Sequence, residues 1–311
     1  MKQTREAMTQ NLAERWCWQA ARRDDARVAR RLDRKQVVDG VYQLDEGALL
    51  DDFCYFLQEL GVDDWLSDVQ GTGIQREMGP VVQYLLRYSL KTLCGIERMN
   101  ALPALLFSDA ALMRLVGFNA QQVRQGVCQR GAARRQGPRT TGPICPDALA
   151  DNVVKLNLRD LETLFNRVIR ALAQAQVFAA QVTGIVDATD LETTAQYEGC
   201  GRVTRQRNIT DKRGTVHEIE VTVYGWTLIV LIEAHTKIPL AAKVVPIQEH
   251  ETLSLRALVT QARTNLASHA RLHKVVFDKG LLDGVDLWWL AQHGMLFVVP
   301  AKGNMAVTVD A

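Results

Sequence analysis

The chain has 311 residues, which is enough for two domains, because single hydrophobic cores seldom grow beyond about 250–300 residues. Its 37 basic and 35 acidic side chains give a formal net charge of +2, so the total charge indicates neither a nucleic-acid partner nor a membrane surface. The six cysteines form no Cys-x-x-Cys pair, and no stretch approaches the roughly 18 apolar residues of a membrane span, so we expect a cytoplasmic protein with reduced thiols and no membrane association.

The first part of the chain has helical periodicity. From Thr9 to Gln129 apolar residues recur at steps of three and four, as at Leu49, Phe53 and Phe56. Glycine and proline interrupt this pattern at Gly79-Pro80. The pattern predicts an all-helical amino-terminal domain over residues 1–130.

Basic residues gather at the end of this domain and in the segment that follows it. Residues 108–130 divide at Gly117 into two short helical stretches, the size of a helix-turn-helix unit, although an ordinary helical hairpin is the simpler alternative. Residues 131–150 are rich in glycine and proline and are predicted to form an exposed basic linker. The arginines of this region that suit phosphate contact are Arg124, Arg130, Arg134, Arg135 and Arg139.

The pattern changes from helix to strand after residue 182. Residues 151–180 are helical, and apolar, β-branched runs then predict strands at 183–186, 220–232, 240–247, 274–277 and 295–299, with helices at 251–266 and 285–292. This order predicts an α/β domain over residues 151–311, in which helices flank a mixed sheet.

Two aspartates directly follow predicted strands. Asp187 ends the apolar run at 183–186, and Asp278 ends the run at 274–277. Ligands of open α/β sheets gather beyond the carboxyl ends of strands, so these two carboxylates are expected to meet in space. Paired carboxylates suit Mg²⁺ or Mn²⁺ and therefore phosphoryl-transfer chemistry. The alternative is that each aspartate only caps a turn or a helix.

Several segments resemble the DDE-type transposases of bacterial insertion sequences. Val186-Asp187-Ala188-Thr189 resembles the Asp-x-Thr that carries the first catalytic acid of that family, and Val275-Val276-Phe277-Asp278-Lys279-Gly280 resembles its second block. Residues 224–230 with 238–240 are similar to its central hairpin, and residues 294–302 are similar to the strand after the second helix. The likeness covers about residues 183 to 304.

This resemblance implies an RNase H-like fold in which acidic side chains, here Asp187 and Asp278, hold Mg²⁺ or Mn²⁺ and DNA phosphodiesters are cleaved and joined. It also implies double-stranded DNA partners, namely inverted-repeat ends and a target, and a homo-oligomer on DNA. The family's third acid is a Glu in a later Tyr-x-x-Arg-x-x-x-Glu pattern, which this sequence lacks before Ala311. We therefore expect an incomplete RNase H-like domain with a truncated metal site.

Other residues near the two aspartates in the sequence are not predicted to be catalytic. Arg202, Arg205, Arg207 and Lys212 lie in a polar stretch after Asp187, where DNA contact competes with a solvated loop. His250, which lies between Glu249 and Glu251, has no metal-ligand spacing with a partner and is expected to be an ordinary exposed residue. Asp283 and Asp286 are expected at a helix amino terminus, and Trp288-Trp289 in the core.

Three other functions compete with transposition. A phosphatase of the haloacid dehalogenase kind requires Asp-x-Asp, whereas Thr189 stands where its second acid belongs. An RNase H-like nuclease of another family shares the expected fold and differs in its products. A non-catalytic remnant that binds DNA or inhibits a full-length transposase needs neither Asp187 nor Asp278.

Overall fold

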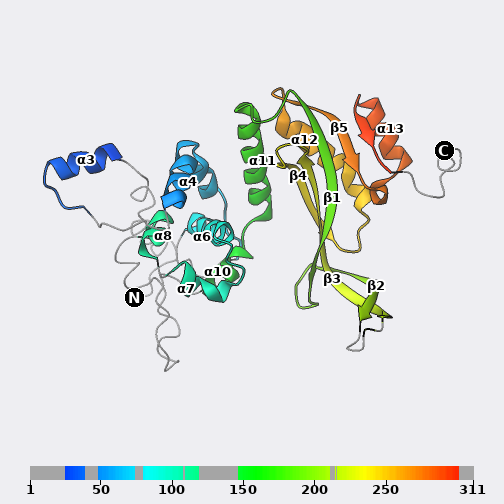
Figure 1. Ribbon diagram of the computed structural model, residues 1–311, viewed down its shortest axis with the longest axis horizontal. Helices are drawn as coiled ribbons and strands as arrows, with labels where there is room; N and C mark the ends of the chain where they lie inside the picture. Colours follow the sequence, from blue (N-terminus) through cyan, green and yellow to red (C-terminus); the bar gives the residue numbers. More distant parts are fainter. Residues whose placement is uncertain are drawn as a thin grey trace. The chain divides into compact units, whose positions relative to one another are not determined.

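The computed structural model describes residues 25–38, 48–73, 80–107, 109–118, 146–210, 214 and 216–300. The chain divides into two compact units, Met1–Leu164 and Phe165–Ala311 (Figure 1). Helix α11 (Leu158–Gln174) runs across this division in the sequence. Most of the predicted linker at 131–150 lies outside the described residues, so the division into 1–130, 131–150 and 151–311 stays a prediction.

The amino-terminal unit is built from helices. They are α3 (Asp25–Asp33), α4 (Ala48–Glu59), α5 (Val62–Ser67), α6 (Val81–Leu93), η1 (Met99–Ala101), α7 (Leu102–Leu105), α8 (Ala110–Leu115) and α10 (Pro146–Val153). The apolar faces of α5, α6, α7, α8 and α10 enclose a core in which Leu102, Leu106 and Met113 are fully buried. The predicted helical character is thus confirmed for the described residues, because the three- and four-residue spacing places these side chains on inward faces.

One cation lies inside this helical core. The side chain of Arg87 in α6 is fully buried, and its guanidinium carbon lies 4.6 Å from the Tyr84 ring centroid and 5.2 Å from that of Phe118. Its Nε donates to the Gln83 carbonyl at 2.9 Å, whereas Nη1 and Nη2 have no hydrogen-bond partner in the described part of the chain. Burial lowers the pKa of Arg87 to about 10. The two rings therefore partly replace the solvation that this cation loses.

A six-stranded mixed sheet forms the carboxy-terminal unit. Its strands are β1 (Gln181–Thr193), β2 (Gly201–Thr210), β3 (Val216–Glu233), β4 (Pro239–Pro246), β5 (Arg271–Phe277) and β6 (Leu296–Val298). The order is β2-β3-β1-β5-β6, with β4 also paired to β3. Strands β1, β5 and β6 run parallel, and β3 is antiparallel to β1, β2 and β4. This α/β architecture confirms the predicted mixed sheet with flanking helices after a helical region, and it is consistent with an RNase H-like domain.

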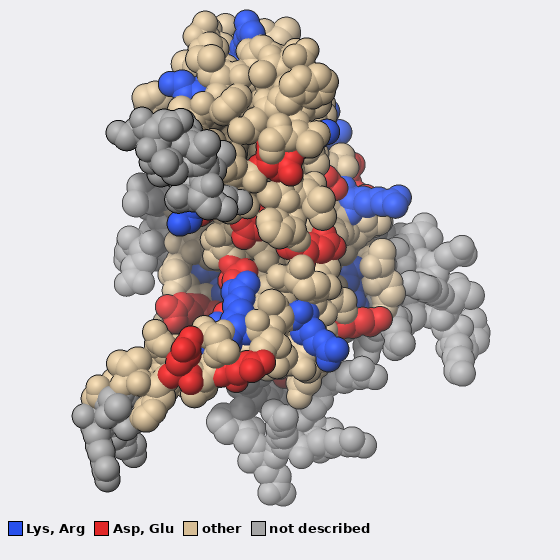
Figure 2. All heavy atoms as spheres, turned by 90° about the vertical axis from the view of Figure 1, so that its right-hand side faces the viewer, with Lys and Arg blue, Asp and Glu red and all other residues tan. Residues whose placement is uncertain are grey.

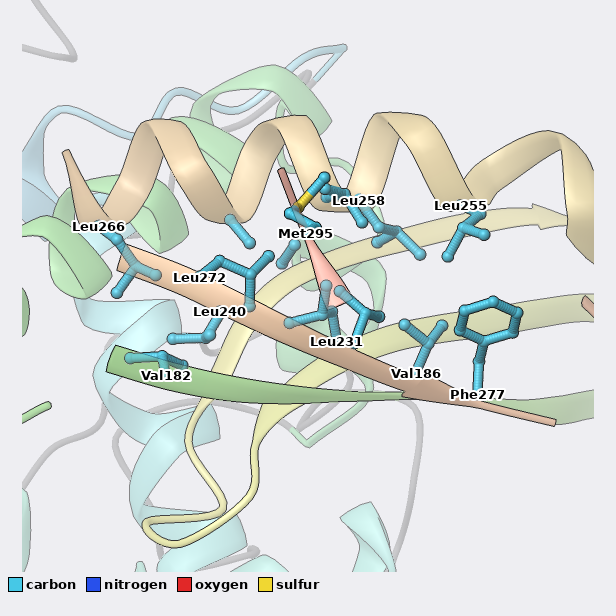
Figure 3. Close-up of a cluster of buried hydrophobic side chains, with 14 of the residues drawn as sticks. Val182, Val186, Leu231, Leu240, Leu255, Leu258, Leu266, Leu272, Phe277 and Met295 are labelled. Atoms are coloured by element: carbon cyan, nitrogen blue, oxygen red, sulfur yellow. The ribbon is translucent and has the colours of Figure 1, made fainter. Parts of the chain in front are cut away.

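Helices cover the face of the sheet that carries its core. They comprise η2 (Glu251–Ser254), α12 (Leu255–Leu266), η3 (Lys279–Leu281) and α13 (Gly284–Gln292). On β1, Val182 and Val186 are buried while Ile185 between them is partly exposed, as strand alternation requires. Figure 3 shows Val182, Val186 and Phe277 directed toward the α12 side of the sheet.

Two details of this unit differ from the interpretations offered by the sequence. Residues 201–210, for which a solvated loop was the alternative to DNA contact, form strand β2, and every residue of β2 is paired with the first half of β3. Trp288 is 64% exposed instead of packed in the core, whereas Trp289 packs against the core as expected. Among the described residues, no helix has the length and apolar character needed to cross a bilayer.

Candidate active site

Asp187 and Asp278 extend from neighbouring parallel strands. The register of β1 with β5 pairs Val186 with Phe277, and the two aspartates are the next residues on their strands. Val186 and Phe277 are buried on the same side of the sheet, whereas Asp187 and Asp278 are exposed (Figure 3). The register thus brings the backbone positions of two aspartates that are distant in the sequence next to each other, with Asp187 within β1 and Asp278 directly after β5.

Local hydrogen bonds hold one oxygen of each aspartate. Asp187 Oδ1 accepts from the Ala188 amide at 2.9 Å. Asp278 Oδ1 accepts from the Gly280 amide at 2.7 Å and so caps η3, as the simpler interpretation of this residue expected. Neither carboxylate forms an ion pair with a residue that the structure describes. Each carboxylate therefore has an oxygen that these bonds do not use.

A third carboxylate, that of Glu251, lies near this pair. A methyl group placed on Gly280 would lie 3.7 Å from Glu251 Oε2 and 3.8 Å from Asp278 Oδ1. Burial raises the pKa of Glu251, and the negative charges of Asp190, Asp278 and Asp187 raise this pKa further. Glu251 is thus within electrostatic reach of both aspartates.

The path of the chain explains how Glu251 reaches this position. Strand β3 lies between β1 and β4 and is antiparallel to both, so β4 runs in the same direction as β1. The chain that leaves β4 at Pro246 therefore emerges toward the carboxyl end of β1, and η2 begins at Glu251, five residues later. Only the strand order reveals this neighbourhood, because Glu251 itself has no motif around it.

A fourth carboxylate, that of Asp190, already has an arginine partner. It pairs with Arg205 of β2 and accepts from Thr227 Oγ1 at 3.1 Å. The hydrogen bond from Arg205 lowers the pKa of Asp190 despite partial burial. Two residues further along β1, Glu192 pairs with Arg207. These two ion pairs connect the β2 edge of the β2–β3 ribbon to β1.

The basic residues expected to contact DNA occupy different situations. Arg202 is exposed on β2, whereas Arg205 and Arg207 are held by the carboxylates just named. Arg124, Arg130, Arg134, Arg135, Arg139 and Lys212 lie outside the described residues, as does the second stretch of the suggested helix-turn-helix. On the face shown in Figure 2, acidic and basic side chains are interspersed, so that face has no broad patch of a single charge.

The donor chemistry of this end of the sheet fits a hard divalent cation. Carboxylate oxygens are the ligands that Mg²⁺ and Mn²⁺ prefer, and Asp187 and Asp278 supply them without a competing basic partner in the described region. In this arrangement, no three His, Cys, Asp or Glu side chains within the described residues converge as a ready metal site. The two aspartates fit the cation as a pair that needs further ligands from water, substrate or another side chain.

Comparison with known proteins found a matching family and similar solved structures. Residues 179–310 match the family described as Transposase DDE domain. Among solved structures, the chain is similar to the piggyBac transposase in its synaptic complex with hairpin DNA, determined by cryo-EM, at 12% sequence identity and a TM-score of 0.26. That similarity covers 53% of this chain and 35% of the piggyBac chain, so the chain spans little more than a third of that structure. No curated protein matches the sequence.

Proposed function

Because residues 179–310 match the family described as Transposase DDE domain, we propose that the protein is a DNA transposase of an insertion sequence, with Asp187 and Asp278 as catalytic acids. The observation that supports the proposal most strongly is the register of β1 with β5, in which Val186 pairs with Phe277, the residues that precede the two aspartates. Both lie in motifs of the matched segment, and both are exposed to a substrate.

In the proposed mechanism, Asp187 and Asp278 are the residues that would hold the divalent cation at the scissile phosphodiester of DNA. When bound, Mg²⁺ or Mn²⁺ supplies charge stabilisation for in-line attack on phosphorus. Asp278 is fixed by its bond from the Gly280 amide, so its carboxylate is preorganised and does not rotate freely. Asp187 lies within a paired strand, which restricts its backbone in the same way.

The proposed partner is double-stranded DNA, both at the ends of the element and at the target, bound by a homo-oligomer in the cytoplasm. Arg202 on β2 and the arginines from Arg124 to Arg139 are the proposed phosphate contacts, together with Lys212. Arg205 and Arg207 join them if DNA competes with Asp190 and Glu192 for their guanidinium groups. Salt is expected to weaken this binding strongly.

A strand-cleavage assay tests the proposal. The purified chain is incubated with the DNA that flanks its own coding region, with Mg²⁺, with Mn²⁺ or with a chelator. Nicking and joining of the freed 3′-hydroxyl are expected only with metal. Asp187→Asn and Asp278→Asn are each expected to lower the rate by at least about a hundredfold, consistent with the loss of several kcal/mol of transition-state stabilisation.

Asp151→Asn is the matched control, since Asp151 is an exposed aspartate of α10 in the other unit. Metal-independent cleavage, or full activity of both active-site variants, contradicts the proposal. DNA binding without any cleavage, unaffected by metal and by both substitutions, favours a non-catalytic remnant instead.

A further inference from the structure

Three carboxylates near the carboxyl end of β5 form no ion pair with a residue in the described part of the chain. These are Asp187, Asp278 and Glu251, whereas the nearby Asp190 is occupied by Arg205 and Thr227. Three like charges held near one another repel unless a cation lies among them. The site therefore contains more negative charge than the two motif aspartates alone supply.

We infer that Glu251 is a further ligand of the divalent cation bound by Asp187 and Asp278, a role that rests on the function proposed above. Glu251 Oε2 and Asp278 Oδ1 lie at similar distances, 3.7 and 3.8 Å, from one point beside Gly280. The Glu251 side chain is partly exposed and has three rotatable bonds, so a change of rotamer moves its oxygens by several ångströms without moving the backbone. The Glu251 carboxylate can therefore reach a cation held by Asp187 and Asp278 from its present position.

The backbone around Glu251 is positioned well enough for this role. Glu251 begins η2, which continues directly into α12, and the buried side chains of Ser254, Leu255 and Leu258 anchor that helix to the core. The contact between η2 and η3 fixes the segment of Glu251 relative to the segment that follows Asp278. Two ligand-bearing turns are thus packed against each other.

A structural role is the competing explanation, because an acidic residue at the start of η2 also interacts favourably with the amino terminus of a helix. That role affects folding stability and is indifferent to divalent cations. Cation affinity, measured separately from stability, therefore separates the two explanations.

The test measures Mn²⁺ binding to the full chain by electron paramagnetic resonance, with urea denaturation of each variant as a check on folding. Glu251→Gln is expected to weaken Mn²⁺ binding about tenfold or more while the chain remains folded. Glu249→Gln is the matched control, because Glu249 is exposed and lies only two residues away. It is expected to keep Mn²⁺ affinity within about twofold of the unsubstituted chain.

Asp187→Asn distinguishes failure of this inference from failure of the proposed function. If Asp187→Asn abolishes Mn²⁺ binding and Glu251→Gln leaves it unchanged, the cation site stands and Glu251 is not a ligand. If Glu249→Gln weakens binding as much as Glu251→Gln does, the effect is one of general charge and the inference is wrong. If the unsubstituted chain binds no Mn²⁺, or Asp187→Asn has no effect, the proposed cation site fails and the role of Glu251 fails with it.

Discussion

Replacing Gly225 by alanine should destabilise the sheet that carries the candidate site. Gly225 lies in β3 where this strand pairs with Glu192 of β1 on one side and Gly201 of β2 on the other. Its φ is 157°, and a Cβ there would lie 2.3 Å from the Leu191 carbonyl oxygen. Because the obstacle is backbone and not the end of a flexible side chain, β1 and β3 must separate locally.

The magnitude follows from two costs. An alanine in this sparsely populated region of φ costs about 1–3 kcal/mol, and each ladder hydrogen bond that is weakened costs about 0.5–1.5 kcal/mol. Together we expect Gly225→Ala to lower the free energy of unfolding by about 2–4 kcal/mol. For a domain of this size that corresponds to a fall in Tm of roughly 5–15 °C.

Chemical and thermal denaturation of the full chain, followed by circular dichroism, measures this loss. Gly284→Ala is the control, because a Cβ on Gly284 meets no atom within 4 Å at the start of α13, and it should leave stability unchanged or raise it by up to about 1 kcal/mol. If Gly225→Ala proves as stable as Gly284→Ala, the close approach of β1 and β3 at this point is incorrect.

Two further substitutions test the electrostatics of the units. The folded-state pKa of Asp190 is lowered chiefly by Arg205, so their pair stabilises the fold above the ordinary carboxyl pKa of about 4 and the contribution is lost as the pH falls through the lowered value. Asp190→Asn should therefore reduce the loss of folding stability at acidic pH. The reduction should be less than about 1 kcal/mol, because both side chains of the pair are partly exposed. An unchanged loss of stability at acidic pH would refute the pairing. Arg87→Met should leave the free energy of unfolding unchanged or raise it, whereas Arg87→Ala should lower it by about 2–4 kcal/mol because of the cavity that it leaves. Urea denaturation measures both changes. A large loss of stability in Arg87→Met would show instead that the buried cation stabilises the core.

Much of the architecture was predictable because local signals and tertiary packing agree. The apolar runs before Asp187 and Asp278 are strands buried on one face, and their β-branched composition marks them in the sequence. Asp283 was expected at a helix amino terminus, and its Oδ1 indeed accepts from the Val285 amide at 2.8 Å. In both cases the determinants lie within a few residues of one another.

Other features depended on contacts that no local pattern encodes. Strand β2 has polar residues and looked like a loop, yet pairing with the long β3 and ion pairs from Arg205 and Arg207 hold it in the sheet. Glu251 was not singled out from the sequence, because the carboxylates that it senses electrostatically, those of Asp187 and Asp278, belong to distant segments of the chain. The strand order β4-β3-β1-β5 is the information that the sequence pattern lacked.

The most direct test of the proposed site is a crystal structure of the full chain grown with Mn²⁺, with anomalous scattering recorded to locate the metal. The account predicts an anomalous peak about 2.0–2.3 Å from a carboxylate oxygen of Asp187 and of Asp278. A structure in which Asp187 and Asp278 are well ordered but no anomalous peak lies between them, or in which Mn²⁺ is bound only elsewhere on the chain, would contradict the proposed site.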